Sequence, residues 1–177
     1  MVRSRTFYAI ILALSLSAPA GAAEAESSVV LGARYHMVDL AGRAPAHLGG
    51  LTAGMEWGLS DFWNLQATLS GEGGGTLAGE AAAGGTVGIQ ISTLIDATQW
   101  VPYLSVGIRG GLLDLGLDAA IDPYLELYGG GGVDYRPARG WSVGVFGFGG
   151  LTWSGPGFGA SAGGLLTFKM FIPHFFE

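Results

Sequence analysis

The sequence has no cysteine, little charge and, beyond its N-terminus, no long apolar run. The lack of cysteine excludes disulfide frameworks, thiolate nucleophiles and zinc–thiolate sites. Charged residues make up 12% of the chain, about half of the roughly 25% that is usual in soluble domains. Few side chains are therefore available to cover a water-facing surface. The formal net charge of −6 also argues against nucleic-acid binding, which needs clustered Lys and Arg.

Residues 1–22 have the composition of a secretory signal peptide. Arg3 and Arg5 supply a positive start, TFYAIILALSLSA supplies a short apolar stretch, and small residues over 18–22 supply cleavage sites. The apolar stretch is shorter than the roughly 18–20 residues that span a bilayer. Cleavage near Ala22 or Ala23 is therefore expected rather than a retained anchor. Because no later segment could form a membrane helix, the mature chain over 23–177 could cross a membrane only with strands.

Apolar residues at every second position, the period of a β-strand, continue from residue 28 to the end. In LTAGMEWGLSDFWNLQATLS (51–70), one alternating set is apolar and the other is small or polar, on both sides of a turn at Ser60-Asp61. The same rhythm predicts eight strands, near 28–38, 51–59, 63–70, 85–95, 100–112, 123–135, 141–153 and 164–176. In the seventh strand, the segment VFGFGG leaves the phase of Phe146 and Phe148 open.

The predicted connections alternate in length. Short ones lie at 60–61, 96–99 and 136–140, and longer Gly/Ala/Pro-rich segments lie at 40–49, 71–84, 113–122 and 154–163. Short turns on one rim and long loops on the other are typical of an up-and-down barrel in an outer membrane.

Alternation alone fits two folds, a soluble lipocalin-type barrel with its apolar face inside and a membrane barrel with its apolar face toward lipid. The polar face here consists mostly of Gly, Ser, Thr, Asn and Gln, with about one charge per strand, whereas a solvated face normally carries many Lys and Glu. Small polar residues suit the narrow interior of an eight-stranded barrel. This composition favours the membrane barrel.

Tryptophan placement supports the same interpretation. The tryptophans all fall in the apolar phase and at strand ends, as in the aromatic girdles at the two interfaces of a membrane barrel. The predicted girdle comprises Trp57, Trp63, Trp100 and Trp141 beside the short turns and Trp153 at the opposite end of its strand.

Charge placement is the third feature. A basic side chain facing the bilayer midplane would cost roughly 2–4 kcal/mol, and the strand charges all fall in the polar phase. Arg109 and Glu126 stand level on adjacent strands, which predicts a lumenal ion pair. Glu56 is expected to reach Arg34 on the neighbouring strand, with Lys169 on the closing strand nearby. The predicted structural charge network of the lumen is Arg34, Glu56, Arg109, Glu126, Asp134 and Lys169.

The mature chain resembles the small eight-stranded outer-membrane barrels of the OmpA, OmpX and OmpW type. The resemblance rests on GLTAGMEWGLSDFWNLQATLS, QWVPYLSVGIRGG and the aromatic final strand GLLTFKMFIPHFF. It implies residence in the cell outer membrane after export, with contacts to outer-membrane lipid and lipopolysaccharide. It also implies that the barrel-insertion machinery reads the C-terminal strand. Such strands commonly end in an aromatic residue, whereas here Phe175 and Phe176 precede a final Glu177.

The predicted fold is thus an all-β, eight-stranded, antiparallel up-and-down transmembrane barrel. The main functional hypothesis is a structural barrel with a lumen plugged by side chains and with surface loops for external contacts. A small gated pore and a soluble periplasmic lipocalin-like carrier are the alternatives. No catalytic residue, cofactor or metal site is predicted, because no Ser–His–acid motif is found around His36, His47 or His174. The residues do not specify a ligand or an oligomeric state.

Overall fold

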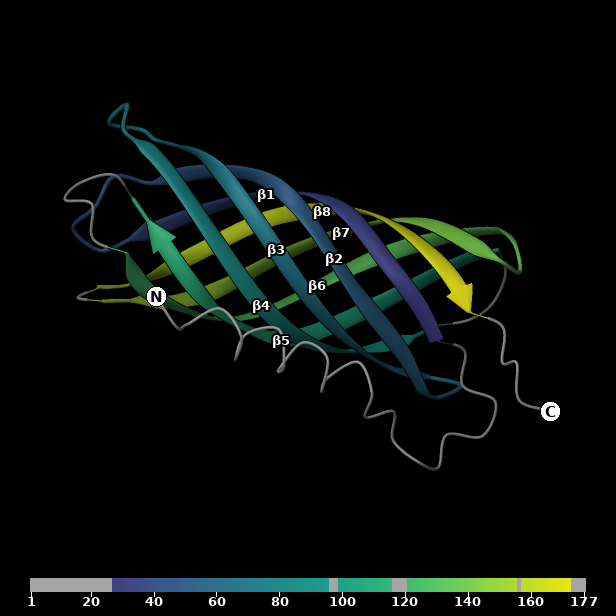
Figure 1. Ribbon diagram of the computed structural model, residues 1–177. Coiled ribbons are helices and arrows are strands. Elements are labelled where there is room, and N and C mark those ends of the chain that lie inside the picture. Colours follow the sequence, from purple (N-terminus) through teal and green to yellow (C-terminus); the bar gives the residue numbers. More distant parts are fainter. Residues whose placement is uncertain (1–26, 96–98, 116–120, 156, 173–177) are drawn as a thin grey trace, which may run out of the picture.

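The computed structural model describes residues 27–95, 99–115, 121–155 and 157–172 (Figure 1). The predicted signal peptide and the C-terminal residues from 173 onward lie outside the described residues. The described residues include no helix that is long and apolar enough to cross a membrane. The strands, in chain order, are β1 (Ser27–Leu40), β2 (Ala46–Ser60), β3 (Trp63–Thr76), β4 (Ala81–Leu94), β5 (Trp100–Asp114), β6 (Asp122–Ala138), β7 (Trp141–Ser154) and β8 (Gly157–Ile172).

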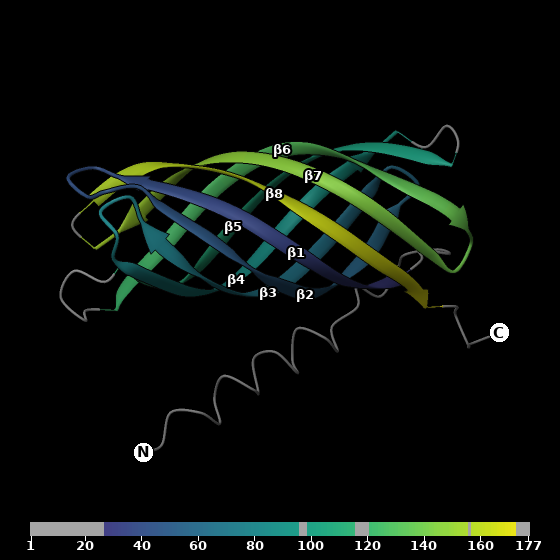
Figure 2. The same ribbon diagram turned by 90° about the horizontal axis from the view of Figure 1, so that it is seen from above.

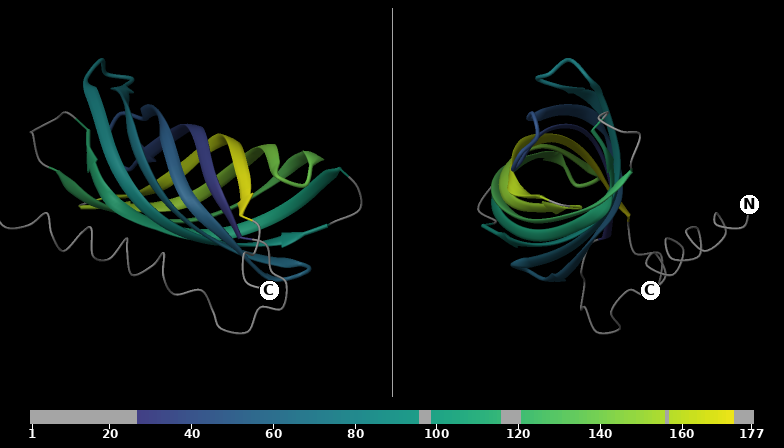
Figure 3. Two further views of the ribbon diagram at one scale, coloured as in Figure 1. Left: turned by 45° about the vertical axis from the view of Figure 1, so that its right-hand side comes forward. Right: turned by 90° about the vertical axis from the view of Figure 1, so that its left-hand side faces the viewer.

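The strands form one closed antiparallel barrel. Each strand pairs with the next along the chain, and β8 pairs with β1 from Ser27↔Ile172 to Leu40↔Gly159. The ring is visible in the right-hand view of Figure 3. Closure leaves no strand edge without hydrogen-bond partners, which is the condition for strands in hydrocarbon. The predicted eight-stranded up-and-down barrel is therefore confirmed.

The strands are strongly tilted with respect to the barrel axis (Figure 2). A path around the barrel can be drawn from Val30 by moving from each residue to its register partner on the next strand. This path does not close at Val30 but returns to β1 at Leu40. Because of this stagger, lumenal side chains that lie at the same level along the barrel axis are not, in general, register partners of one another. The path runs through Val30, Gly54, Thr68, Gly88, Arg109, Glu126, Thr152, Gly159 and Leu40.

We call the end of the barrel that carries Ser27 and Ile172 the terminal rim, and the other end the opposite rim. The prediction of long loops over 71–84 and 154–163 is wrong. β3 continues to Thr76, β4 begins at Ala81 and β8 begins at Gly157. The β3–β4 connection is a tight turn, in which Gly79 N donates to Thr76 O over 2.9 Å.

These glycine-rich segments form strands because the closed sheet supplies their backbone hydrogen-bond partners. Glycine has low strand propensity by itself. At Gly74 and Gly159, however, a Cβ atom would overlap the backbone oxygen of His47 or Asp39 on the adjacent strand. The missing side chain lets the two strands approach closely. Composition alone therefore indicated loops where the tertiary ladder produces strands.

The two faces of the barrel have the predicted orientation. Leu104 and Val106 are 61% and 60% exposed on the outer wall, whereas Glu126 and Asp134 are fully buried in the lumen at 0%. The lipocalin-type alternative required the apolar rows to line the interior and is contradicted. Phe146 and Phe148, whose phase the sequence left open, both face the lumen.

Candidate functional site

The lumen begins, at the opposite rim, with an apolar layer that the sequence analysis did not predict. It consists of inward side chains in the phase expected to be polar, such as Val38 on β1 and Leu48 on β2. The sequence did contain a signal for this layer, because apolar residues occupy the lumen-facing phase near these strand ends. The layer comprises Val38, Leu40, Ala46, Leu48, Ala82, Leu113, Leu115 and Tyr124.

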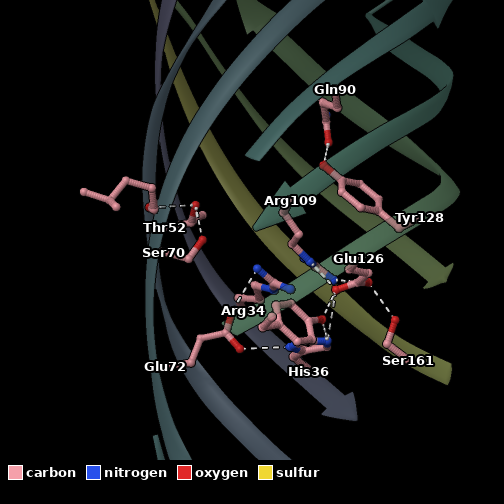
Figure 4. Close-up of polar contacts among 12 residues, drawn as sticks. Arg34, His36, Thr52, Ser70, Glu72, Gln90, Arg109, Glu126, Tyr128 and Ser161 are labelled. Atoms are coloured by element: carbon pink, nitrogen blue, oxygen red, sulfur yellow. Dashed lines mark hydrogen bonds and ion pairs between the residues drawn. The ribbon is translucent and has the colours of Figure 1, made fainter. Parts of the chain in front are cut away.

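Below this layer lies a group of buried charges that we call the arginine cluster, formed by Arg34, His36, Glu72, Arg109 and Glu126 (Figure 4). Arg109 and Glu126 are direct register partners on β5 and β6. Arg109 donates from Nε to Glu126 Oε2 and from Nη2 to Oε1, each over 2.5 Å. The two residues that the sequence placed level thus form a two-donor ion pair.

Glu126 receives further hydrogen bonds. Ser161 Oγ donates to Glu126 Oε1 over 2.6 Å, and Tyr124 Oη donates to Glu126 Oε2. His36 Nε2 lies 3.5 Å from the same oxygen. This many partners compensate a carboxylate for burial. Glu126 is the point where side chains from β1, β5, β6 and β8 meet.

Arg34 pairs with Glu72 and not with Glu56, so the expected pairing is corrected. Arg34 Nη1 lies 2.8 Å from Glu72 Oε1. Arg34 stands opposite Gly50, and Gly50 stands opposite Glu72. A Cβ at Gly50 would overlap the backbone oxygen of Gly71 and would lie 2.9 Å from Glu72 Cγ. Because the intervening residue has no side chain, the ion pair forms across β2.

Glu72 was not predicted to lie in the lumen because it falls in the segment that was assigned to a loop. Its signal was the continued alternation of Asn64, Gln66, Thr68 and Ser70 along β3, which puts Glu72 in the lumenal phase. His36 Nδ1 lies 3.0 Å from Glu72 Oε2. His36 therefore connects the Arg34–Glu72 pair to the Arg109–Glu126 pair.

Aromatic and amide side chains fill the middle of the lumen. The guanidinium carbons of Arg34 and Arg109 lie 5.2 and 4.5 Å from the centre of the Phe148 ring, within the range of cation–π attraction. Tyr128 Oη donates to Gln90 Oε1 over 3.1 Å. A Cβ at Gly107 would lie 2.6 Å from Tyr128 Oη, so this glycine leaves room for the ring.

A second group of buried charges, the lysine cluster, lies nearer the terminal rim and consists of Glu56, Asp134 and Lys169. Lys169 Nζ lies 2.9 Å from Glu56 Oε2 and 2.8 Å from Asp134 Oδ2. Asn64 Nδ2 donates to Glu56 Oε1 over 3.1 Å. Register explains the choice of Lys169, because Glu56 stands opposite Ser28 and Lys169 opposite nearby Val30.

The tryptophans lie on the outer wall, with one departure. Trp63, Trp100 and Trp141 are exposed near the terminal rim, and Trp153 is exposed near the opposite rim. Trp57 differs, because only 9% of its surface is exposed. The exposed members have ring neighbours, with centroid distances of 4.6 Å for Trp100–Tyr135 and 5.4 Å for Trp153–Phe158.

The arrangement can close the lumen in successive layers of apolar, ionic and aromatic side chains. In the part of the chain that the structure describes, no group of three or more His, Asp and Glu side chains is placed to hold a metal ion.

Several solved structures have a similar fold, although no sequence match is found. No family model matches the sequence, and no curated protein matches it. Neisserial surface protein A has a TM-score of 0.62 at 13% identity, over 84% of this chain and 99% of that one. The N-terminal barrel domain of Pseudomonas aeruginosa OprF has a TM-score of 0.51 at 14% identity, over 83% and 100%. Ail, the attachment invasion locus protein of Yersinia pestis, has a TM-score of 0.52 at 11% identity, over 84% and 99%. The chain thus has the fold of the small eight-stranded outer-membrane barrels.

Proposed function

We propose that the protein is an integral, non-enzymatic barrel of a Gram-negative-type outer membrane, with a lumen sealed by its own side chains. The main observation in support of this proposal is the outer wall, where every strand exposes large apolar side chains. A continuous apolar surface around a whole barrel is unfavourable in water and suits the acyl chains of a bilayer. One exposed residue from each strand in order is Leu31, Leu51, Leu69, Ile89, Ile108, Leu127, Leu151 and Leu166.

The proposed location and partners follow from this surface and from the fold. The likeness to Neisserial surface protein A supports an outer-membrane location, and the predicted signal peptide supports export. Outer-membrane lipid and lipopolysaccharide would contact the apolar wall and its rims, and the insertion machinery would read the C-terminal strand. External contacts would use the turns at one rim, which are shorter over 77–80 than the predicted loop.

A lysine scan of β5 tests the membrane location. Val106 lies mid-strand, and Leu112 lies near the opposite rim on the same outer face. In a bilayer, Val106→Lys should lower the free energy of unfolding by roughly 2–4 kcal/mol and Leu112→Lys by about 0–1 kcal/mol. The measurement is urea unfolding of refolded protein in phospholipid vesicles. Equal costs at the two positions would contradict a bilayer around the middle of the barrel.

Conductance separates a sealed barrel from a small gated pore. An eight-stranded barrel has an interior that side chains can fill, and the apolar layer closes the lumen independently of the ion pairs. Planar bilayers should stay silent with the wild-type protein and also with Glu126→Ala, because Val38, Leu48 and Leu113 remain in place. Channels that open only in Glu126→Ala would overturn the permanent seal in favour of a gated plug.

A further inference from the structure

The outer wall carries an apolar groove that crosses β7, β8, β1, β2 and β3. Its volume is about 710 Å³, within the roughly 300–1,000 Å³ of small-molecule sites. Small residues, Ala33, Ala53 and Gly71, leave room between larger ones such as Leu51 and Leu166. A Cβ at Gly71 would have no atom within 4 Å. No side chain of this chain therefore fills the groove at that point.

The groove follows the register rows across the strands. The register path from Val30 to Leu40 approaches the opposite rim as it passes from β1 to β2 and β3. In the reverse direction, from β1 to β8 and β7, a row approaches the terminal rim. The β7 end of the groove is therefore nearest the terminal rim. The members of one row in the groove, from that end, are Val143, Phe168, Leu31, Ala53 and Leu69.

The length of the groove matches one leaflet of a bilayer. From β7 to β3 there are four spacings between strands, each about 4.8 Å, which gives about 19 Å. The hydrocarbon core of a bilayer is about 30 Å thick, so one leaflet takes about 15 Å of it. Because the strands are tilted, the groove runs obliquely from the terminal rim toward the middle of the wall. An acyl chain that enters from the terminal rim can therefore lie along it.

The β6–β7 turn, at the terminal-rim end of the groove, is basic. Residues 136–140 include Arg136 and Arg139 and no carboxylate. Neither arginine forms an ion pair with another described residue. Arg139 is exposed, and the guanidinium carbon of Arg136 lies 4.8 Å from the centre of the Phe171 ring. The β2–β3 turn at the same rim carries Asp61 instead. A negatively charged group is therefore favoured beside the β6–β7 turn.

Trp141 lies between this turn and the groove. It is 39% exposed on the outer wall, two residues after Arg139 and two residues before Val143. Its ring centroid lies 6.1 Å from that of Phe168, which lines the groove. Tryptophan favours the interface between the headgroups and the hydrocarbon. The order of arginine, tryptophan and apolar groove thus matches the order of phosphate, glycerol region and acyl chain in a phospholipid.

We propose that this surface binds one anionic glycerophospholipid from the leaflet at the terminal rim. The phosphate lies at Arg136 and Arg139, and one acyl chain lies in the groove. A guanidinium binds phosphate oxygens through charge-assisted hydrogen bonds, and basic residues near the membrane surface attract anionic lipids. The site rests on the proposed membrane location, because it needs the groove to face hydrocarbon.

Native mass spectrometry of the refolded full-length protein tests the site. The protein in detergent micelles is titrated with dioleoyl phosphatidylglycerol or with dioleoyl phosphatidylcholine, which has the same acyl chains and no net charge. The expected result is one retained lipid, with a dissociation constant roughly 5–30-fold lower for phosphatidylglycerol, since each arginine contributes about 5-fold. Equal dissociation constants for the two lipids would overturn the proposal.

Variants separate the two parts of the site. Arg136→Gln/Arg139→Gln should lose the preference for phosphatidylglycerol, and Arg43→Gln at the opposite rim is the control that should keep it. Ala53→Phe places a ring in the groove and should lose the retained lipid, whereas Leu104→Phe, on β5 outside the groove, should keep it. A preference that survives in the double variant, or a lipid retained by Ala53→Phe, would contradict the site.

The wild-type comparison decides by itself if a variant does not fold. The lysine scan of β5 does not involve this surface. Depth-dependent costs in that scan, together with equal dissociation constants for the two lipids, would therefore overturn the lipid site and leave the membrane location supported.

Discussion

The arginine and lysine clusters place buried charge in the same lumen by different means. In the arginine cluster, each guanidinium has its own carboxylate, and His36 connects the two pairs. In the lysine cluster, a single ammonium group lies between Glu56 and Asp134. Arginine has five donors in a fixed plane, whereas lysine is a compact charge with rotatable donors.

This difference indicates which charged side chains can be substituted at a small cost in stability. Loss of Glu126 leaves Arg109 buried without the carboxylate that holds it through two hydrogen bonds. Loss of Glu56 leaves Lys169 still paired with Asp134 at 2.8 Å. We therefore expect substitutions in the arginine cluster to destabilise the barrel more than the removal of one carboxylate from the lysine cluster.

The largest expected effect comes from breaking the Arg109–Glu126 pair. Glu126→Leu should lower the free energy of unfolding by roughly 3–5 kcal/mol, because it leaves an uncompensated buried charge. Arg109→Leu/Glu126→Leu should recover much of this loss, since it removes both charges together. Urea unfolding of refolded protein in vesicles gives both values. A double variant as unstable as the single one would show that unpaired charge is not the cause.

A smaller effect is expected where the Arg34–Glu72 pair crosses β2. Gly50→Ala places a Cβ against the backbone oxygen of Gly71 and against Glu72 on β3, and should cost roughly 1–3 kcal/mol through overpacking. Gly49→Ala is the matched control, because a Cβ at Gly49 has no atom within 4 Å. The comparison of the two neighbouring alanines by urea unfolding isolates the close approach of β2 and β3 at Gly50. Similar costs at the two positions would mean that strand propensity, and not this contact, requires Gly50.

The smallest effect should follow from Glu56→Gln. Glutamine keeps an oxygen that can accept from Asn64 Nδ2, and Lys169 keeps Asp134 as a partner. The expected cost is about 1 kcal/mol, that of one weakened buried hydrogen bond. Urea unfolding beside Glu126→Leu measures it. If Glu56→Gln lowered the free energy of unfolding as much as Glu126→Leu does, the proposed difference between the two clusters would be contradicted.

Much of the architecture followed from period-two alternation. Glu56 and Arg109 were assigned to the lumen because a strand exposes alternate residues on opposite faces. The Arg109–Glu126 pair was predictable because the two residues are level on adjacent strands joined in sequence. By contrast, Glu72 was missed because glycine and alanine around it suggested a loop. Its position in β3 depends on hydrogen bonds to neighbouring strands.

By itself, the sequence determined the all-β fold, the strand number and the face of the charges that lie in the predicted strands, because these follow from local periodicity. Tertiary structure alone decided that Arg34 pairs with Glu72 instead of Glu56, and that Lys169, expected near Glu56, is the ion-pair partner of both Glu56 and Asp134. It also decided that Phe146 and Phe148 fill the lumen. The physical reason is the closed, tilted sheet. Its stagger sets which inward-facing residues lie at the same level along the barrel axis, and glycines on intervening strands set which of these side chains can make contact.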